Sequence, residues 1–152
     1  MSKKSWNEKL NDSKNMPLVE EVTPECAVRF GGSKMLLAPP LAYDEIMKAI
    51  PEGRLITTDR IRSHLAKKYG ADFTCPLTAG IFVNIAANAS DERGGANNTP
   101  YWRTLKKDGE LCEKYPNGLE GHKMLLEMEG HKVVNKGKRM FVEGYEEKLL
   151  WQ

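Results

Sequence analysis

Apolar residues in the middle of the chain recur with the period of an α-helix. From Tyr43 onward they stand three and four positions apart, at Tyr43, Ile46, Met47 and Ile50. Side chains at this spacing share one face, so the pattern predicts a helix with a buried side. A second helix is expected from Thr57 or Thr58 to Tyr69, because threonine is a good N-cap. Its buried stripe is expected to be Ile61, Leu65 and Tyr69.

A third helix is expected from Pro76 to about Ala89, since proline is well tolerated in the first helical turn. This segment contains no charged residue. Its buried stripe is expected to be Leu77, Ile81 and Ile85. Most of its other side chains are small and permit close approach of a backbone. The sequence leaves open whether that backbone is another helix of the protein or a nucleic acid.

The flanking segments predict short helices and strands. Before residue 43 we expect a short helix capped by Ser5 and Glu8, an irregular stretch around Pro17 and Pro24, and a strand at 34–38. After residue 98 we expect a strand at 99–107 that turns as a hairpin at Asp108-Gly109, a helix at 119–129, a hairpin at 133–142 and a last helical turn at 145–151. The fold class is therefore α+β, with an N-terminal extension, residues 1–42, packed on a domain of residues 43–152.

Composition is that of an ordinary globular protein, because 40% of the 152 residues are hydrophobic and 29% are charged. No apolar run approaches the ~20 residues that a transmembrane helix needs. The first ten residues carry charges where a signal peptide needs an apolar core. We therefore expect a cytoplasmic protein that does not associate with membranes.

The net charge of +2 is too small to indicate a nucleic-acid partner by itself. The basic residues are unevenly distributed, however, because five of them face a single acid, Asp59, between residues 54 and 68. Such a cluster can neutralise DNA phosphates. A solvated helix face is the equally acceptable alternative.

The three cysteines, Cys26, Cys75 and Cys112, show neither disulfide nor zinc spacing, and the histidines do not complete a ligand set. We expect no metal and no cofactor. Cys75 precedes the uncharged helix, where the helix N-terminus can stabilise a thiolate. A small structural cysteine is the more common use of such a position.

A resemblance to a known family rests on several stretches in collinear order. Residues 100–103, Pro-Tyr-Trp-Arg, are followed by 115–120, Tyr-Pro-Asn-Gly-Leu-Glu, and by 123–131, Lys-Met-Leu-Leu-Glu-Met-Glu-Gly-His. They resemble the C-terminal domain of the methylated-DNA-protein-cysteine methyltransferases. Upstream, residues 50–58 resemble the start of that domain's helix-turn-helix. The resemblance covers roughly residues 43 to 131 and implies a winged-helix domain.

The resemblance also implies that the family's alkyl transfer is absent. The family signature is Pro-Cys-His-Arg, and here Tyr101 stands at the cysteine position and Trp102 at the histidine position. Glu129 stands at the position of the family's glutamate but lacks both partners. A phenol with a pKa of ~10 is a poor nucleophile at neutral pH. We therefore expect no catalytic residue.

A branch of this family, the alkyltransferase-like proteins, lacks the cysteine but binds alkylated guanine and marks it for repair. By resemblance, the lesion pocket would comprise Tyr101, Trp102, Arg103 and Glu129. An aromatic side chain can stack on an extruded base for roughly 1–3 kcal/mol. The alternative is that Tyr101 and Trp102 are ordinary residues of a strand in the core.

The predicted DNA contacts follow the same resemblance and the charge pattern. They are Thr58, Arg60, Arg62, Lys67, Thr78, Ala79, Asn84 and Asn88. Ala79 lies near the place of a family arginine that fills the gap left by a flipped base, and Thr58 takes the place of a family tyrosine. Asn88 matches an asparagine that ties the recognition helix to the strand with the signature.

The expected function is recognition of O6-alkylguanine in double-stranded DNA without alkyl transfer, with a repair protein as a further partner. Two alternatives stay open. One is a winged-helix regulatory or protein-interaction domain. The other is a divergent enzyme that uses Cys75 or Cys112.

Overall fold

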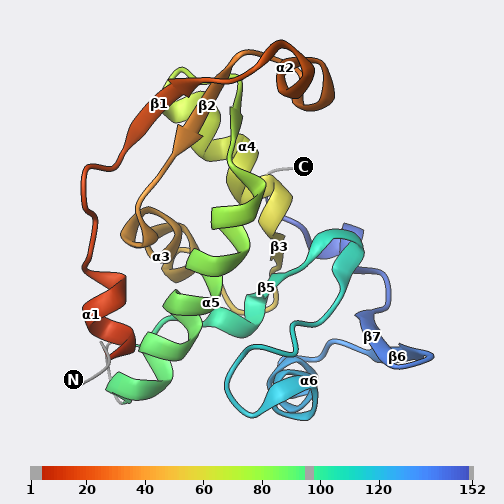
Figure 1. Cartoon of the computed structure of the whole chain (residues 1–152). Helices are drawn as coiled ribbons and strands as arrows, with labels where there is room; N and C mark the ends of the chain where they lie inside the picture. The colour runs from red at the N-terminus through yellow and green to blue at the C-terminus, as the bar shows by residue number, and fades with distance from the viewer. Residues whose placement is uncertain (1–4, 95–97, 151–152) are drawn as a thin grey trace.

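The computed structural model describes residues 5–94 and 98–150 and shows the mixed α+β fold that the sequence predicts (Figure 1). Three helices meet at its centre: α3, Pro40–Lys48, α4, Thr58–Lys68, and α5, Pro76–Arg93. Their shared core includes Tyr43, Met47, Ile50, Ile61 and Leu65, all at most 1% exposed. The apolar spacing of residues 43–50 and 61–65 therefore predicted the buried faces of α3 and α4 correctly.

Tyr69 does not continue the buried stripe of α4. The helix ends at Lys68, and Tyr69 is its C-cap, with 36% of its surface exposed. Gly70 follows with a φ of 68°, a conformation that glycine adopts without strain. The chain therefore leaves the helix before Tyr69 can reach the core.

Helix α1, Trp6–Leu10, begins with the predicted capping box. The Ser5 hydroxyl accepts from the Glu8 N–H at 3.1 Å, and the Glu8 carboxylate accepts from the Ser5 N–H at 3.3 Å. This helix packs along α5 (Figure 1), and its Leu10 is buried.

The stretch around Pro17 and Pro24 is more regular than predicted. It forms strand β1, Leu18–Glu21, and helix α2, Pro24–Phe30. Proline is tolerated at the first helical position, and the Thr23 hydroxyl caps α2 by accepting from the Cys26 N–H at 3.3 Å. Each proline therefore begins or precedes an element instead of interrupting one.

A three-stranded sheet joins this N-terminal part to the helices that follow. Strand β1 pairs antiparallel with β2, Lys34–Leu37, and β2 pairs parallel with β4, Phe73–Thr74. Strand β2 confirms the strand predicted at 34–38. Because β4 connects α4 to α5, the sheet fixes β1 and β2 against these two helices.

Helix α5 differs from its prediction in length and in its buried face. It runs to Arg93, so part of the expected polar loop is helical. Leu77 is 74% exposed and Ile81 is 50% exposed, whereas Ile85 is buried. The buried positions of its first half are Ala79 and Val83, and the same face continues at Ala86. The predicted stripe was right at Ile85 and wrong at Leu77 and Ile81, because the first half of the helix packs through its smaller side chains, where two backbones can come close.

The segment after residue 98 is not the predicted strand with a hairpin. It forms a 3₁₀ turn, η2, Tyr101–Arg103, then strand β5, Thr104–Leu105, and a second turn, η3, Lys107–Gly109. Strand β5 pairs in parallel with β3, Ile56–Thr57, which lies nearly fifty residues earlier. The expected sharp turn does occur, since Asp108 and Gly109 have φ angles of 67° and 82°. After this turn the chain does not form a strand along β5; instead, Glu110 forms an isolated antiparallel bridge with Phe141, in the later strand β7, Arg139–Val142.

The C-terminal part follows its prediction closely. Helix α6, Gly118–Met128, is followed by a hairpin of β6, Val133–Lys136, and β7, Arg139–Val142. The last turn, η4, covers Tyr145–Lys148, and the predicted end of that turn at residue 151 lies outside the described residues. A second apolar core lies here, built from Leu55, Leu105, Leu111, Leu126, Met140 and Val142.

Candidate nucleic-acid interface

A surface cavity of about 320 Å³ lies where α4, the first half of α5 and residues 106–115 meet. Its lining includes four of the predicted DNA contacts, Thr58, Arg62, Ala79 and Asn84. From the connecting segment it is lined by Lys106, Lys107, Cys112, Glu113, Lys114 and Tyr115. Ligand pockets commonly measure about 300–1,000 Å³, so this cavity is at the lower end of the range for a small ligand. We call it the α5 cavity.

Helical spacing brings these side chains together. Thr58 is the first residue of α4 and Arg62 lies four residues later, so both face the same side. On α5, a Cβ atom added at Gly80 would meet nothing within 4 Å. The missing side chain at Gly80 therefore leaves open space on the helix surface beside the α5 cavity.

The rim of the α5 cavity is mainly cationic. Lys106 pairs with Glu110 at 3.7 Å and with Glu113 at 3.5 Å. Glu110 is further engaged by Arg139 at 2.8 Å, and these hydrogen bonds hold its pKa below the usual range. Within residues 5–94 and 98–150, neither Lys107 nor Lys114 forms an ion pair. These two amines remain available for an anionic ligand.

Tyr115, and not Tyr101, lines the α5 cavity. The Tyr115 hydroxyl donates to the carbonyl of Thr104 at 2.8 Å, and burial raises its pKa well above the usual value. Tyr101 is 6% exposed and meets Tyr115 edge to face, with ring centroids 5.3 Å apart. Tyr101 therefore lies in the layer behind Tyr115, with Trp102 against its ring at 5.4 Å.

Trp102, Arg103 and Glu129 form a polar clamp that holds this layer. Arg103 donates to Glu129 through Nε at 3.0 Å and Nη2 at 2.7 Å, and the Trp102 indole N–H donates to it at 2.9 Å. Burial would raise the pKa of Glu129, but the bonds from Arg103 and Trp102 outweigh burial and lower it. The Arg103 Nη1 also donates to the carbonyl of Ile50 at 2.8 Å. The clamp therefore fastens η2 to the end of α6 and to the loop after α3.

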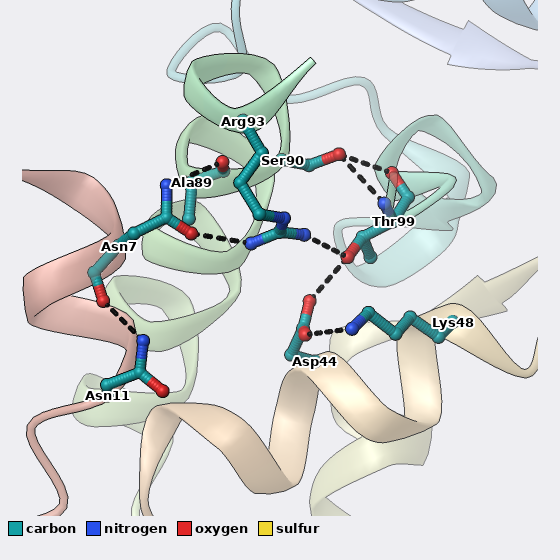
Figure 2. A network of polar contacts seen from close by, with 8 residues as sticks. All are labelled: Asn7, Asn11, Asp44, Lys48, Ala89, Ser90, Arg93 and Thr99. Carbon is teal, nitrogen blue, oxygen red and sulfur yellow. Dashed lines mark hydrogen bonds and ion pairs between the residues drawn. The ribbon is translucent and has the colours of Figure 1, made fainter. Parts of the chain in front are cut away.

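A second polar network holds the chain just before Tyr101 (Figure 2). The Thr99 hydroxyl donates to Asp44 at 2.6 Å and accepts from Arg93 at 3.2 Å, and Asp44 also pairs with Lys48 at 3.3 Å. Arg93 reaches α1 by donating to Asn7 at 2.7 Å. Thr99 and Asp44 are at most 1% exposed, so the centre of this network is buried, and Lys48 reaches it from the surface. It ties α1, α3 and the end of α5 to the residues that lead into η2.

His122 is a buried residue that sequence analysis did not single out. The Cys112 N–H donates to its Nδ1 at 3.1 Å, so the proton of the neutral ring is on Nε2, which donates to the carbonyl of Trp102 at 2.9 Å. Burial lowers the pKa of His122 from 6.5 to about 4. The ring is therefore neutral at pH 7. Its two hydrogen bonds connect Cys112, which lines the α5 cavity, to Trp102 of η2.

Neither candidate cysteine has the surroundings of a nucleophile. Burial raises the pKa of the Cys112 thiol, which keeps it in the less reactive protonated form. Cys75 is the residue before α5 and makes no side-chain cap bond to that helix. The imidazole nearest Cys112, that of His122, has both ring nitrogens engaged, with the Cys112 N–H and the Trp102 carbonyl, so neither is free to take the thiol proton.

The remaining predicted contacts are dispersed. Asn88 donates to the carbonyl of Lys114 at 3.2 Å and to Asn84 at 2.9 Å, so it ties α5 to the segment that closes the cavity. The Thr78 hydroxyl donates to the carbonyl of Cys75 at 3.4 Å. Arg60 lines a smaller cavity of about 210 Å³ beside Tyr145. Lys67 lines a separate cavity near α2.

The first half of α5 carries two exposed apolar side chains, Leu77 and Ile81, which we call the apolar ridge. A further cavity of about 420 Å³ lies on the α1 side of α5 and shares Gly80, Asn84 and Lys114 with the α5 cavity. The first half of α5, which carries the apolar ridge, therefore has a cavity on each side.

The described residues contain no cluster of three or more His, Cys, Asp or Glu side chains arranged to hold a metal ion. Across the same residues, every helix is too short or too polar to span a membrane.

Two solved structures share the fold of this chain. The crystal structure of S. pombe Atl1 in complex with damaged DNA containing O6-carboxymethylguanine matches with a TM-score of 0.52 and 16% identity, over 74% of this chain and 94% of that one. The crystal structure of S. pombe ATL in complex with DNA matches with a TM-score of 0.51, the same identity and the same coverage. No protein-family model and no curated protein matches the sequence. At this level of identity the likeness establishes the fold.

Proposed function

We propose that this protein binds double-stranded DNA and recognises an alkylated guanine without transferring the alkyl group. The observation that carries the proposal is the α5 cavity, where predicted DNA contacts from two helices meet two unpaired lysines. A fold shared with proteins solved on DNA, one of them on DNA with an O6-modified guanine, supports it. In this proposal α4 and α5 form a helix-turn-helix, and the hairpin of β6 and β7 is the wing.

The first half of α5 is the part that would enter a DNA groove. It carries no charge, and Gly80 lets a backbone approach without displacing any protein atom. Proteins that bind the minor groove often insert apolar side chains between base steps. Leu77 and Ile81 offer such side chains, and their exposure is otherwise unfavourable for a protein in water.

The cations around this half-helix would meet phosphates on both sides of the groove. Arg62 stands on the α4 side of the α5 cavity, and Lys107 and Lys114 stand on the opposite wall. Each phosphate that such a cation neutralises releases a counterion, so binding should weaken steeply as salt rises.

The extruded base would enter the α5 cavity and lie against Tyr115. In this arrangement Tyr101 packs against the Tyr115 ring and keeps it in place. The Trp102–Arg103–Glu129 clamp in turn holds Tyr101, because the Trp102 ring packs against it. This assigns Tyr101, Trp102, Arg103 and Glu129 to the support of the pocket. No alkyl transfer is proposed, because Cys112 is held as a thiol and a tyrosine of raised pKa stands at the family's cysteine position.

An equilibrium titration tests the proposal. A short duplex with one O6-methylguanine is compared with the same duplex undamaged, at two salt concentrations. Tighter binding to the damaged duplex supports recognition. Lys107→Ala and Lys114→Ala should each lower the salt slope by about 1, whereas Lys123→Ala on α6 should not change it.

Gly80 provides a sharper variant. Gly80→Leu adds a side chain where the helix surface is open, so the fold should tolerate it while the approach of DNA is blocked. Gly80→Ala is the matched control with little added bulk. Loss of binding in Gly80→Leu alone supports the cavity, and equal binding by both variants contradicts it. An unchanged protein mass after incubation with the damaged duplex checks that no alkyl group is transferred.

A second function, docking of another protein, is favoured by the apolar ridge, because exposed neighbouring apolar side chains often mark an interface. It predicts no binding to either duplex at low salt. In that case the ridge would be the surface with which to search for a protein partner.

A further inference from the structure

A second cavity, of about 330 Å³, lies between α2, α4 and β4, and we call it the α2 cleft. Its floor is apolar: the rings of Phe30 and Phe73 are stacked with centroids 5.0 Å apart, and Ala66 is 5% exposed. Its edge is basic, with Arg62 and Lys67 from the outer side of α4. An apolar floor beside two cations suits a ligand with an apolar part and a negative charge.

Arg62 connects the α2 cleft to the proposed DNA site, because it lines both this cleft and the α5 cavity. Neither Arg62 nor Lys67 forms an ion pair among the described residues. The acid that lines the cleft, Asp72, is engaged, since its carboxylate accepts from the Lys34 N–H at 3.0 Å. A backbone donor does not cancel the charge of Asp72, but the lining still has two cations to one acid and therefore attracts an anion that passes the α5 cavity.

Helix α2 is held in place by its surroundings but contributes nothing to the core. It contains no buried residue, and its Val28 is 86% exposed. A close turn fixes its end, because a Cβ atom at Gly32 would lie 2.3 Å from the Asp72 Cβ, and the Asp72 N–H donates to the Lys34 carbonyl at 2.9 Å. Figure 1 shows α2 at the tip of the three-stranded sheet, beyond the strands. The fold thus positions α2 firmly at the surface, where its Phe30 completes the cleft.

We infer that the α2 cleft binds a sugar–phosphate segment of the DNA strand that runs on from the α5 cavity. The phosphate would lie between Arg62 and Lys67, and the deoxyribose would pack on the edge of the Phe30 and Phe73 rings. The N-terminal part of the chain then lengthens the DNA footprint on one side. The inference rests on the proposed DNA binding and extends it to a surface outside the two central helices.

Neighbouring residues supply matched controls. Lys67 lines the cleft, whereas Lys68 lies over the Tyr69 ring at 5.6 Å and does not. Phe30 lines the cleft, whereas Val28, on the same helix, is 86% exposed and does not line it. Lys67→Ala and Lys68→Ala remove the same charge, and Phe30→Ala and Val28→Ala remove an apolar side chain from the same helix.

The test measures the salt dependence of binding and the hydroxyl-radical footprint of the full chain on a long duplex. Lys67→Ala should lower the salt slope by about 1 and shorten the footprint at one end, and Lys68→Ala should do neither. Phe30→Ala should lower affinity several-fold with the slope unchanged, because it removes no charge. Val28→Ala should bind like the unmodified protein.

The outcomes separate this inference from the function on which it rests. If the unmodified protein binds no DNA, both proposals fail. If it binds DNA and Lys67→Ala equals Lys68→Ala in slope and footprint, the α2 cleft is not a DNA site, and the α5 cavity stands alone. Circular dichroism of each variant confirms that a change in binding is not a loss of folding.

Discussion

Two regions of the protein differ in how firmly their side chains are held, and we call them the clamped region and the open region. The clamped region surrounds η2 and is held by the Glu129 clamp, by His122, and by the network of Asp44, Thr99 and Arg93. The open region is the first half of α5, with its apolar ridge and a cavity on each side. One helix belongs to both: α5 is anchored through its last turns, whereas its first turns bury one face and expose the apolar ridge on another. The surface that we propose for DNA is thus carried on an element whose position is fixed elsewhere.

The largest expected effect comes from breaking the clamp at its acid. Glu129→Ala removes the partner of Arg103, whose side chain is only 14% exposed. An ion left without its partner in such a place costs about 3–5 kcal/mol of unfolding free energy. Urea denaturation measures this loss, and Glu113→Ala, a change at an exposed acid, should stay within about 1 kcal/mol. A small loss for Glu129→Ala would mean that the clamp is not a structural anchor.

Ile85 marks the point where α5 passes from the open region to the clamped one. Its side chain is 9% exposed, and Ile85→Ala should lower the unfolding free energy by about 2–4 kcal/mol because it leaves a cavity in the core. The same denaturation experiment measures it. A loss below 1 kcal/mol would show that the anchored half of α5 is looser than its burial indicates.

His122 gives the clamped region a dependence on pH. Its pKa in the folded protein is about 4, below the 6.5 of an unfolded chain, so the unfolded state binds the extra proton as pH falls. Its contribution is fully present above about pH 6.5 and is lost toward pH 4, by up to about 3 kcal/mol. Burial also lowers the pKa of His131, so the informative quantity is a difference between two proteins.

The measurement is the unfolding free energy between pH 7 and pH 4.5, for the unmodified protein and for His122→Asn. As pH falls, the unfolding free energy of the unmodified protein should decrease more steeply than that of the variant. The difference in slope is at most about 1.4 kcal/mol per pH unit, which corresponds to one proton. Parallel curves for the two proteins would contradict a buried neutral His122, whatever the absolute stability of the variant.

A smaller effect is expected at Thr99. Thr99→Val keeps the shape of the side chain but removes the hydroxyl that joins Asp44 to Arg93, which leaves buried polar atoms without a partner. The expected cost is about 1–3 kcal/mol. Thr99→Ser restores the hydroxyl and should recover most of the loss in thermal denaturation. Equal losses in both variants would assign the effect to packing of the methyl group instead.

Local patterns predicted much of the fold. The period of the apolar residues located α3 and α4, the capping box located α1, and turn residues located the hairpin of β6 and β7. Each of these elements is specified within its own stretch of sequence. The pairing of β5 with β3 was not predictable in this way, because it joins residues nearly fifty positions apart and leaves no local signal.

The site was predicted in part. Thr58, Arg62, Ala79 and Asn84 were expected to face DNA, and the structure brings all four to the α5 cavity. Tyr115, Lys107 and Lys114 complete that cavity, but they lie on an irregular connection where no period marks a shared face. His122 looks like any residue of a helix until its two bonding partners are known.

The spacing of apolar residues did not predict the buried face of α5, because two faces of this helix are apolar. Leu77, Ile81 and Ile85 form one regular stripe, and Ala79, Val83 and Ala86 form another. The larger side chains would bury more surface, but the smaller ones allow a neighbouring helix to come closer. Only the partner helices decide between the two stripes, and their positions cannot be derived from α5 itself.

The smallest change in stability, and the most informative about function, is expected at Leu77. With 74% of its surface in water, Leu77→Ala should change the unfolding free energy by no more than about 0.5 kcal/mol. It should still lower affinity for a duplex, since the proposed function places this side chain in the groove. A 2-aminopurine base beside the lesion should brighten less with the variant than with the unmodified protein, because the wedge that separates the bases is shortened. If binding and fluorescence are unchanged, the ridge does not enter DNA, and the open region must serve a different partner.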